Sequence, residues 1–182
     1  MKRRPALLWA AVLAGGLGLW AGHRLVPVPA QQSARTVVGA PVEAAGIGQP
    51  MPALVLPDLH GTPVDLRGFA GRPLLINVWA SWCGPCVEEM PELARFAATQ
   101  GTQGVQVVGL ALDTPEAVQA FLARVPVDYP IVLDTPGPDD ASVRLGNTQG
   151  LLPYSVLVDA QGRLVRQRVG PFEPGMLDSW TR

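Results

Sequence analysis

The stretch NVWASWCGPCVEEMP, residues 77–91, decides the fold that this sequence predicts. A continuous apolar run, residues 74–79, leads into it and is interrupted only by Asn77, as in a strand covered on both faces. Helix-forming residues follow from about Pro85 to Thr99, where glycines end the pattern. The stretch therefore predicts a buried strand, a cysteine pair and a helix in immediate succession.

The spacing of the two cysteines places both thiols on the first turn of this helix. Cys83 falls at the N-terminus, where free backbone N–H groups and the positive end of the helix dipole stabilise a thiolate. Pro85 suits a first turn because it needs no N–H donor, and Gly84 leaves Cys83 uncovered. Cys86 falls about one turn inward. We therefore expect Cys83 to attack a substrate disulfide and Cys86 to resolve the mixed disulfide.

Other uses of a cysteine pair fit this sequence poorly. A zinc site needs about four ligands, and beyond the pair the chain offers only His23 and His60. Haem attachment needs a histidine where Val87 stands. A structural disulfide across two residues closes too small a loop to stabilise much. We expect a redox-active Cys83–Cys86 disulfide, with no metal and no separate cofactor.

The remaining body alternates strands and helices. Residues 54–56 and 105–112 are predicted as strands, residues 64–66 as a strand that pairs back on 54–56, and residues 131–133 as a short strand or an extended segment. Thr114 caps a helix that begins at Pro115. Strands at 154–159 and 163–169 flank a hairpin turn, and only a short helix fits at 173–182. This order predicts an α/β fold with a central mixed sheet flanked by helices.

The N-terminus reads as a membrane-targeting segment. Three basic residues precede an uncharged run, so residues 1–22 are expected to be a signal-anchor that spans the inner membrane once. A cleaved signal peptide is the alternative. A Pro-, Gly-, Ala- and Gln-rich stretch, residues 23–46, predicts a flexible linker before a domain at residues 47–182. Either alternative puts the catalytic domain in the periplasm.

Charge argues against a nucleic-acid partner. The formal net charge is -1, and four basic residues with no acid lie within residues 1–30. The rest of the chain is mildly acidic, with 10 basic and 15 acidic residues. No basic surface is therefore expected on the domain.

The motif at 77–91 resembles the active-site strand and helix of the thioredoxin superfamily, and is most similar to membrane-tethered TlpA/ResA/CcmG-type proteins. Residues 47–59, 107–113 and 152–162 agree with this resemblance. It implies a thioredoxin-like fold, and it implies that Pro153 is a cis-proline that faces the cysteines and binds extended substrate. Trp82, Gly84 and Pro85 would flank the substrate beside it.

Glu89 is the acid to which we assign a role. It lies three residues after Cys86, near the same helix face as Cys83, where a covered carboxyl would have a raised pKa and exchange protons with Cys86. The resemblance links a glutamate at this position to tuning of the thiols. Asn77 stands where cytoplasmic thioredoxins carry a buried aspartate, which strengthens the hypothesis for Glu89.

The resemblance also implies a function and its partners. Tethered proteins of this type reduce protein disulfides and receive electrons from a membrane thiol donor. Apocytochrome c, during cytochrome c maturation, is the substrate this suggests. The Gly-Val-x-Gly-x-Pro-Glu stretch of dedicated CcmG proteins is absent, however, and Gly-Leu-Leu-Pro-Tyr stands at 150–154 instead.

Two other function classes remain open from the sequence. A peroxiredoxin-like antioxidant enzyme shares the fold, although its Pro-x-x-x-Thr-x-x-Cys arrangement is absent before Cys83. A membrane-tethered binding module or chaperone would carry an incidental disulfide. The Cys86→Ser variant distinguishes an oxidoreductase from a binding module, because only an oxidoreductase should then accumulate mixed disulfides at Cys83.

Overall fold

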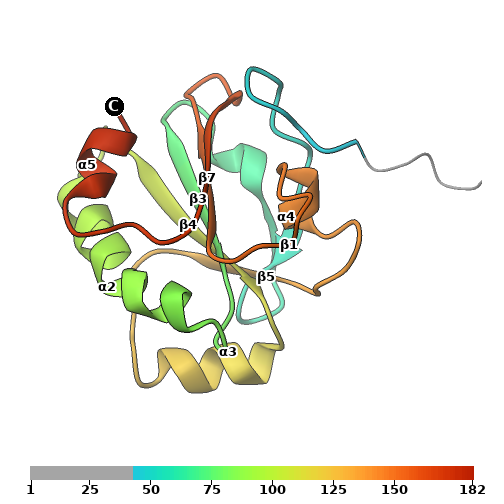
Figure 1. Ribbon diagram of the computed structural model, residues 1–182, viewed down its shortest axis with the longest axis vertical. Coiled ribbons are helices and arrows are strands. Elements are labelled where there is room, and N and C mark those ends of the chain that lie inside the picture. Colours follow the sequence, from blue (N-terminus) through green and yellow to red (C-terminus); the bar gives the residue numbers. More distant parts are fainter. Residues whose placement is uncertain (1–42) are drawn as a thin grey trace, which may run out of the picture. The chain divides into compact units, whose positions relative to one another are not determined.

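A computed structural model of the chain describes residues 43–182 (Figure 1). The predicted anchor at 1–22 and most of the predicted linker at 23–46 lie outside the described residues. Within 43–182, no helix combines the length and the apolar character that a membrane crossing needs. The elements are β1 (Val55–Pro57), β2 (Pro63–Asp65), η1 (Leu66–Phe69), β3 (Leu74–Trp79), α2 (Gly84–Thr99), β4 (Gln106–Leu112), α3 (Pro115–Leu122), β5 (Ile131–Asp134), α4 (Ala141–Arg144), β6 (Tyr154–Val158), β7 (Leu164–Val169) and α5 (Met176–Trp180).

A five-stranded mixed sheet forms the centre of the fold, in the order β5-β4-β3-β6-β7. The strands β3, β4 and β5 run parallel, whereas β6 pairs antiparallel with both β3 and β7. This arrangement confirms the predicted α/β fold with a mixed sheet. β3 is the middle strand, and its Asn77 lies opposite Gly109 on β4 and Ser155 on β6.

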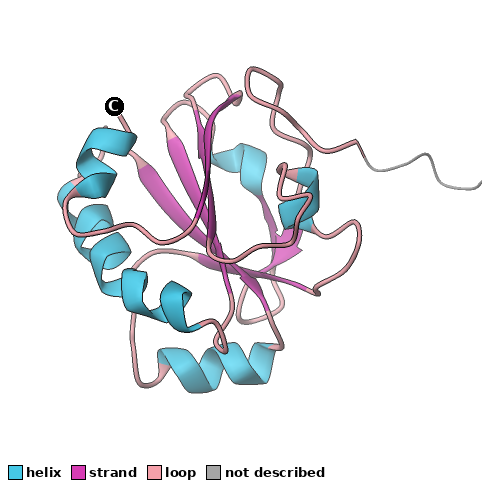
Figure 2. Ribbon diagram, viewed as in Figure 1, coloured by secondary structure: helices cyan, strands magenta, loops and turns pink. Residues whose placement is uncertain are grey.

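Alternate residues of β3 serve two separate cores, because successive strand side chains point to opposite faces. Leu75 and Trp79 pack into the core that α2, α3 and α5 cover, and Ile76 and Val78 pack into the core on the η1 and α4 side. Figure 2 shows these helices on the two sides of the sheet. All six residues of β3 are buried, as the apolar run predicts.

The C-terminal helix α5 is attached to α2 by charged side chains. Glu92 accepts a hydrogen bond from the Gly175 N–H at 2.9 Å, and Arg95 forms ion pairs with Glu92 and with Asp178 of α5. The short helix predicted within residues 173–182 is observed as α5, which is five residues long. These contacts hold it against α2.

The folded unit includes residues on the N-terminal side of residue 47. The Ala45 N–H donates to the Arg144 carbonyl at 2.9 Å, and the Ala45 carbonyl accepts from Gln167 at 3.1 Å. Ala45 is itself buried. The last residues of the predicted linker thus pack on α4 and β7.

Candidate active site

The strand β3 delivers the chain to the active site at its carboxyl end. Trp79 is fully buried there and its ring lies 5.3 Å from that of Phe121 on α3. After the strand ends, the backbone N–H and the hydroxyl of Ser81 both donate to one Asp113 oxygen, at 2.9 and 2.6 Å. Asp113 follows β4, so two neighbouring strand ends fix the loop that precedes the cysteines.

Cys83 is the N-cap of α2, and its Sγ accepts a hydrogen bond from the Cys86 N–H at 3.3 Å. The two cysteines form a disulfide with Cα atoms 5.3 Å apart. Cys86 is fully buried, whereas Cys83 retains an exposed fraction of 6%. When the disulfide is reduced, the same helix N-terminus favours a thiolate at Cys83.

Exposed residues surround this slightly accessible sulfur. The side chain of Trp82 is 69% exposed, and Gly84 and Pro85 are exposed as well. An open hollow of about 510 Å³ runs beside them between α2 and α3, with Glu88 and Arg124 at its edges. Trp82 and Gly84, the two neighbours of Cys83 in the chain, both line this hollow.

Pro153 lies at the same end of the sheet as the cysteines. The Leu152–Pro153 peptide bond is cis, as the resemblance implied. The next residue, Tyr154, pairs with Val78 near the carboxyl end of β3. Pro153 is buried, Leu152 before it is half-buried, and Leu151, two residues before Pro153, is 45% exposed.

Glu89 occupies a buried position on α2, three residues after Cys86, with 2% of its surface exposed. Its Oε1 accepts from the Asn77 amide and its Oε2 accepts from the Phe172 N–H, both at 2.8 Å. The Asn77 amide also donates to the Ser155 hydroxyl at 3.1 Å, while Asn77 Oδ1 has no partner among the described residues. The predicted burial of Glu89 is thus observed, and its carboxyl links α2 to β3 and to the segment that follows β7.

Burial raises the pKa of the Glu89 carboxyl above its ordinary value. The hydrogen bonds from Phe172 and Asn77, and the positive charge of Arg168, favour the ionised form and oppose part of this rise. Burial also raises the pKa of the Tyr129 phenol, and the charge of Glu89 adds to that effect. Glu89 is therefore a carboxyl that can hold or release a proton closer to neutrality than an exposed glutamate.

Sequence reasoning did not identify several residues of this site. Asp113 had a usable signal, because it directly follows a buried strand parallel to β3 and the carboxyl ends of such strands share one edge. Ser155 and Arg168 reach the Glu89 network through strand pairing, and Phe172 through its backbone N–H. No local pattern in the sequence marks these three contacts.

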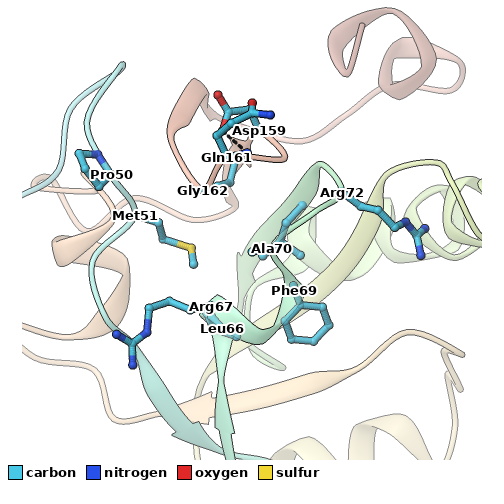
Figure 3. A pocket seen from close by; sticks show the side chains of 12 residues that line it. Pro50, Met51, Leu66, Arg67, Phe69, Ala70, Arg72, Asp159, Gln161 and Gly162 are labelled. Atoms are coloured by element: carbon cyan, nitrogen blue, oxygen red, sulfur yellow. Dashed lines mark hydrogen bonds between the residues drawn. The ribbon is translucent and has the colours of Figure 1, made fainter.

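A second hollow, of about 260 Å³, lies at the opposite end of the sheet (Figure 3). Leu74 and Val158 line it, at the start of β3 and the end of β6. Figure 3 shows the guanidinium groups of Arg67 and Arg72 turned away from its centre. They bind Asp65 and the Gly101 and Gly104 carbonyls instead. The hollow lies away from the cysteine pair, and its lining is apolar except for Arg67, Arg72, Asp159 and Gln161.

Among residues 43–182, no cluster of histidine, cysteine, aspartate and glutamate side chains could hold a metal ion.

Comparison with known proteins identifies the family. The sequence profile of the Redoxin family matches residues 47–180. This chain belongs to the Redoxin family. The match covers nearly the whole described domain, from the segment before β1 to α5.

Individual relatives of this Redoxin protein are named for thiol–disulfide chemistry or for their relation to thioredoxin. Thiol-disulfide oxidoreductase ResA of Bacillus subtilis (strain 168) is 29% identical over 139 residues, which cover 76% of this chain and 75% of that protein. The thioredoxin-related protein of Neisseria meningitidis serogroup B is 32% identical, with a TM-score of 0.61 over 68% of this chain and 93% of that one. A secreted thiol-disulfide isomerase of Corynebacterium glutamicum is 25% identical, with a TM-score of 0.62 over 71% and 80% of the two chains.

The family, the relatives and the geometry agree on the class of enzyme. The Redoxin chain carries a Cys-x-x-Cys disulfide at the N-terminus of a helix, on a thioredoxin-like fold. It is a thiol–disulfide oxidoreductase of the ResA type, and Cys83–Cys86 is its redox-active centre.

Proposed function

We propose that this oxidoreductase reduces disulfide bonds of proteins outside the cytoplasmic membrane, with Cys83 as the attacking thiol and Cys86 as the resolving thiol. The observation that carries the proposal is the unequal placement of the two sulfurs. Cys83 caps α2 beside exposed Trp82, whereas Cys86 is fully buried one turn inward. Only Cys83 is placed to meet an incoming disulfide.

The reaction then balances as two exchange steps. The Cys83 thiolate attacks one substrate sulfur, which forms a mixed disulfide and releases the other substrate sulfur as a thiolate. The Cys86 thiol next gives up its proton and attacks Cys83 Sγ, which frees the second substrate thiol and forms the Cys83–Cys86 disulfide. Two electrons pass from the enzyme to the substrate, and a thiol donor must return them.

We assign to Glu89 the role of accepting the proton of the Cys86 thiol. Both residues are buried on the same side of α2, three positions apart. Because burial raises the pKa of Glu89, its carboxylate is a stronger base than an exposed carboxylate. Glu89 therefore takes the proton as Cys86 attacks and returns it when the centre is reduced again.

Substrate binding falls to the exposed edge of the site. Trp82 supplies apolar contact area, Gly84 and Pro85 leave the sulfur open, and Pro153 borders the site on the β6 side. An extended segment of a disulfide-bonded protein fits this edge. Apocytochrome c is the substrate we propose, because its haem-binding cysteines have to be reduced before haem attachment.

Location and electron supply are inferred from the sequence and the relatives. Residues 1–22 would anchor the chain in the inner membrane, or be cleaved, and would leave the domain in the periplasm. The relative from Corynebacterium glutamicum is a secreted protein, which agrees with such a location. A membrane thiol protein would then supply the electrons.

The direction of electron flow is tested by equilibrating the full-length protein with glutathione redox buffers. A reductant should have a reduction potential near that of thioredoxin, roughly -270 mV. A potential near that of DsbA, roughly -120 mV, would make the protein an oxidant and contradict the proposal. Reduction of a disulfide-bonded apocytochrome c fragment by the reduced protein checks the substrate separately.

A further inference from the structure

Arg168 on β7 is partly buried, and the proposed reaction assigns it no role. Its Nε is buried without a hydrogen-bond partner among the described residues. Its Nη2 donates to the Pro171 carbonyl at 2.9 Å, and its guanidinium carbon lies 5.3 Å from the centre of the Phe172 ring. A guanidinium is attracted to an aromatic face at this distance. Arg168 thus contacts two consecutive residues of the turn that follows β7.

That turn supplies one of the two hydrogen bonds that Glu89 accepts. The Phe172 N–H donates to Glu89 Oε2 at 2.8 Å, inside the buried network. A hydrogen bond to an ionised group needs accurate alignment to repay burial of the charge. By contacting the Pro171 carbonyl and the Phe172 ring, Arg168 fixes both sides of the peptide unit that carries this N–H.

Strand pairing brings Arg168 to the network from a second direction. Arg168 lies opposite Ser155 in the β6–β7 register, and the Ser155 hydroxyl accepts from the Asn77 amide that also donates to Glu89. Directly paired residues on neighbouring strands lie on the same face of a sheet. Arg168 is therefore on the face that carries Glu89.

The groups around Glu89 differ in charge. Four of them come from other elements: Asn77 on β3, Ser155 on β6, Tyr129 before β5 and Arg168 on β7. The Cys83–Cys86 pair shares the α2 helix with Glu89. Asn77 and Ser155 are uncharged, and the Tyr129 phenol is neutral at ordinary pH, with a pKa that burial raises further. The positive charge that acts on this carboxyl comes from Arg168.

We propose that Arg168 is a positioning residue of the active site, which holds the Phe172 N–H on the buried Glu89 carboxyl and supplies the positive charge that this carboxyl faces. The inference deepens the proposed function, because the use of Glu89 in proton transfer rests on that proposal. The placement of Arg168 can be tested without any catalytic measurement.

The test compares Arg168→Gln with Arg166→Gln in the oxidised full-length protein. Arg166 lies two residues away on the same face of β7, but it binds the Trp180 and Arg182 carbonyls instead. In Arg168→Gln, hydrogen exchange of the Phe172 amide should accelerate by about tenfold, since a hydrogen bond to a charged group is weakened. Arg166→Gln should leave this rate within about twofold of the parent.

Titration of the Glu89 carboxyl by carbon NMR gives a second readout. Its midpoint should move to higher pH in Arg168→Gln, because the ionised form loses a positive charge and an aligned donor. Arg168→Lys, which keeps the charge, should restore most of the parent midpoint. The proposal is overturned if the Phe172 amide and the Glu89 midpoint match the parent in a folded Arg168→Gln, or if Arg168→Lys shifts the midpoint as far as glutamine does.

The two proposals can fail independently. A midpoint that moves while the pH profile of thiol–disulfide exchange stays fixed would support Arg168 and contradict the role of Glu89 in proton transfer. A Glu89→Gln variant that alters the exchange profile, with the Phe172 amide and the Glu89 midpoint unmoved in Arg168→Gln, would support Glu89 and overturn the inference for Arg168.

Discussion

Replacement of Glu89 by glutamine keeps the shape of this buried side chain and removes its ionisation. In the parent, Glu89 accepts from Asn77 and from the Phe172 N–H, at 2.8 Å each. The glutamine oxygen can still accept from Phe172. Its amide group can donate to Asn77 Oδ1, which has no partner within residues 43–182 of the parent, once the Asn77 amide turns over. Because volume and the bonds to residue 89 are kept, we expect Glu89→Gln to fold.

Loss of the ionisable Glu89 carboxyl should change how the free energy of unfolding depends on pH. Burial raises the folded-state pKa of Glu89 above the ordinary value of 4.5, which we take for the unfolded chain. Stability from such a group is complete below the unfolded pKa and is lost as pH rises through the folded pKa. The parent should therefore lose about 1.4 kcal/mol for each unit that separates the two pKa values. The stability of Glu89→Gln should not show this loss as pH rises.

Catalysis should change together with stability. Glutamine cannot accept the Cys86 proton, and positioned proton transfer contributes roughly 10²–10⁴-fold to rates. We expect resolution of the mixed disulfide to slow at least about tenfold at neutral pH. The titration of the Cys86 thiol should move as well.

Two assays test this variant: urea unfolding between about pH 4 and 8, and stopped-flow exchange with a disulfide-bonded protein. Glu88→Gln is the matched control, because Glu88 is the exposed neighbour on the same helix. It should change neither quantity. If the free energy of unfolding changes with pH equally in parent and Glu89→Gln, and the exchange rates are equal, Glu89 neither titrates with a raised pKa nor transfers the Cys86 proton.

The hydrogen bond from Arg95, with that from Gly175, lowers the pKa of Glu92 to about 2, so its contribution is complete above pH 4.5 and lost as pH falls through 2. Urea unfolding of Glu92→Gln should show a loss of about 1–2 kcal/mol at neutral pH, after allowance for solvent screening, and almost none near pH 2. An equal loss at both values would contradict this. Trp82 is 69% exposed, so Trp82→Ala should leave the free energy of unfolding within about 0.5 kcal/mol of the parent. Its KM for a disulfide-bonded protein should rise several-fold with kcat kept; an unchanged KM would exclude Trp82 from substrate binding.

Much of this fold could be predicted because its signals are local. The apolar run at 74–79 corresponds to β3 residue for residue, since a buried central strand needs an apolar side chain at nearly every position. The capping position of Cys83 followed from the helix start, and the burial of Glu89 from its three-residue spacing after Cys86. In each case the pattern and its structural cause lie within one element.

The hydrogen-bond partners of Glu89 could not be predicted, because they lie far from it in the sequence and are brought to it by tertiary packing. Phe172 is 83 positions from Glu89 and donates through its backbone, which carries no side-chain signature. Ser155 meets Asn77 only because β6 lies beside β3 in the sheet order. Arg168 reads in the sequence as an ordinary polar residue of an edge strand. Its contact with Phe172 depends on the turn that follows β7.

The central claim is that Cys83 attacks and Cys86 resolves, and the Cys86→Ser variant tests it most directly. Reduced full-length Cys86→Ser should be mixed with a disulfide-bonded protein, quenched with an alkylating agent and mapped by mass spectrometry. We expect a stable mixed disulfide at Cys83, and none in the matched Cys83→Ser variant, whose remaining thiol is buried. Adducts that form in Cys83→Ser but not in Cys86→Ser would reverse the two roles and contradict the account.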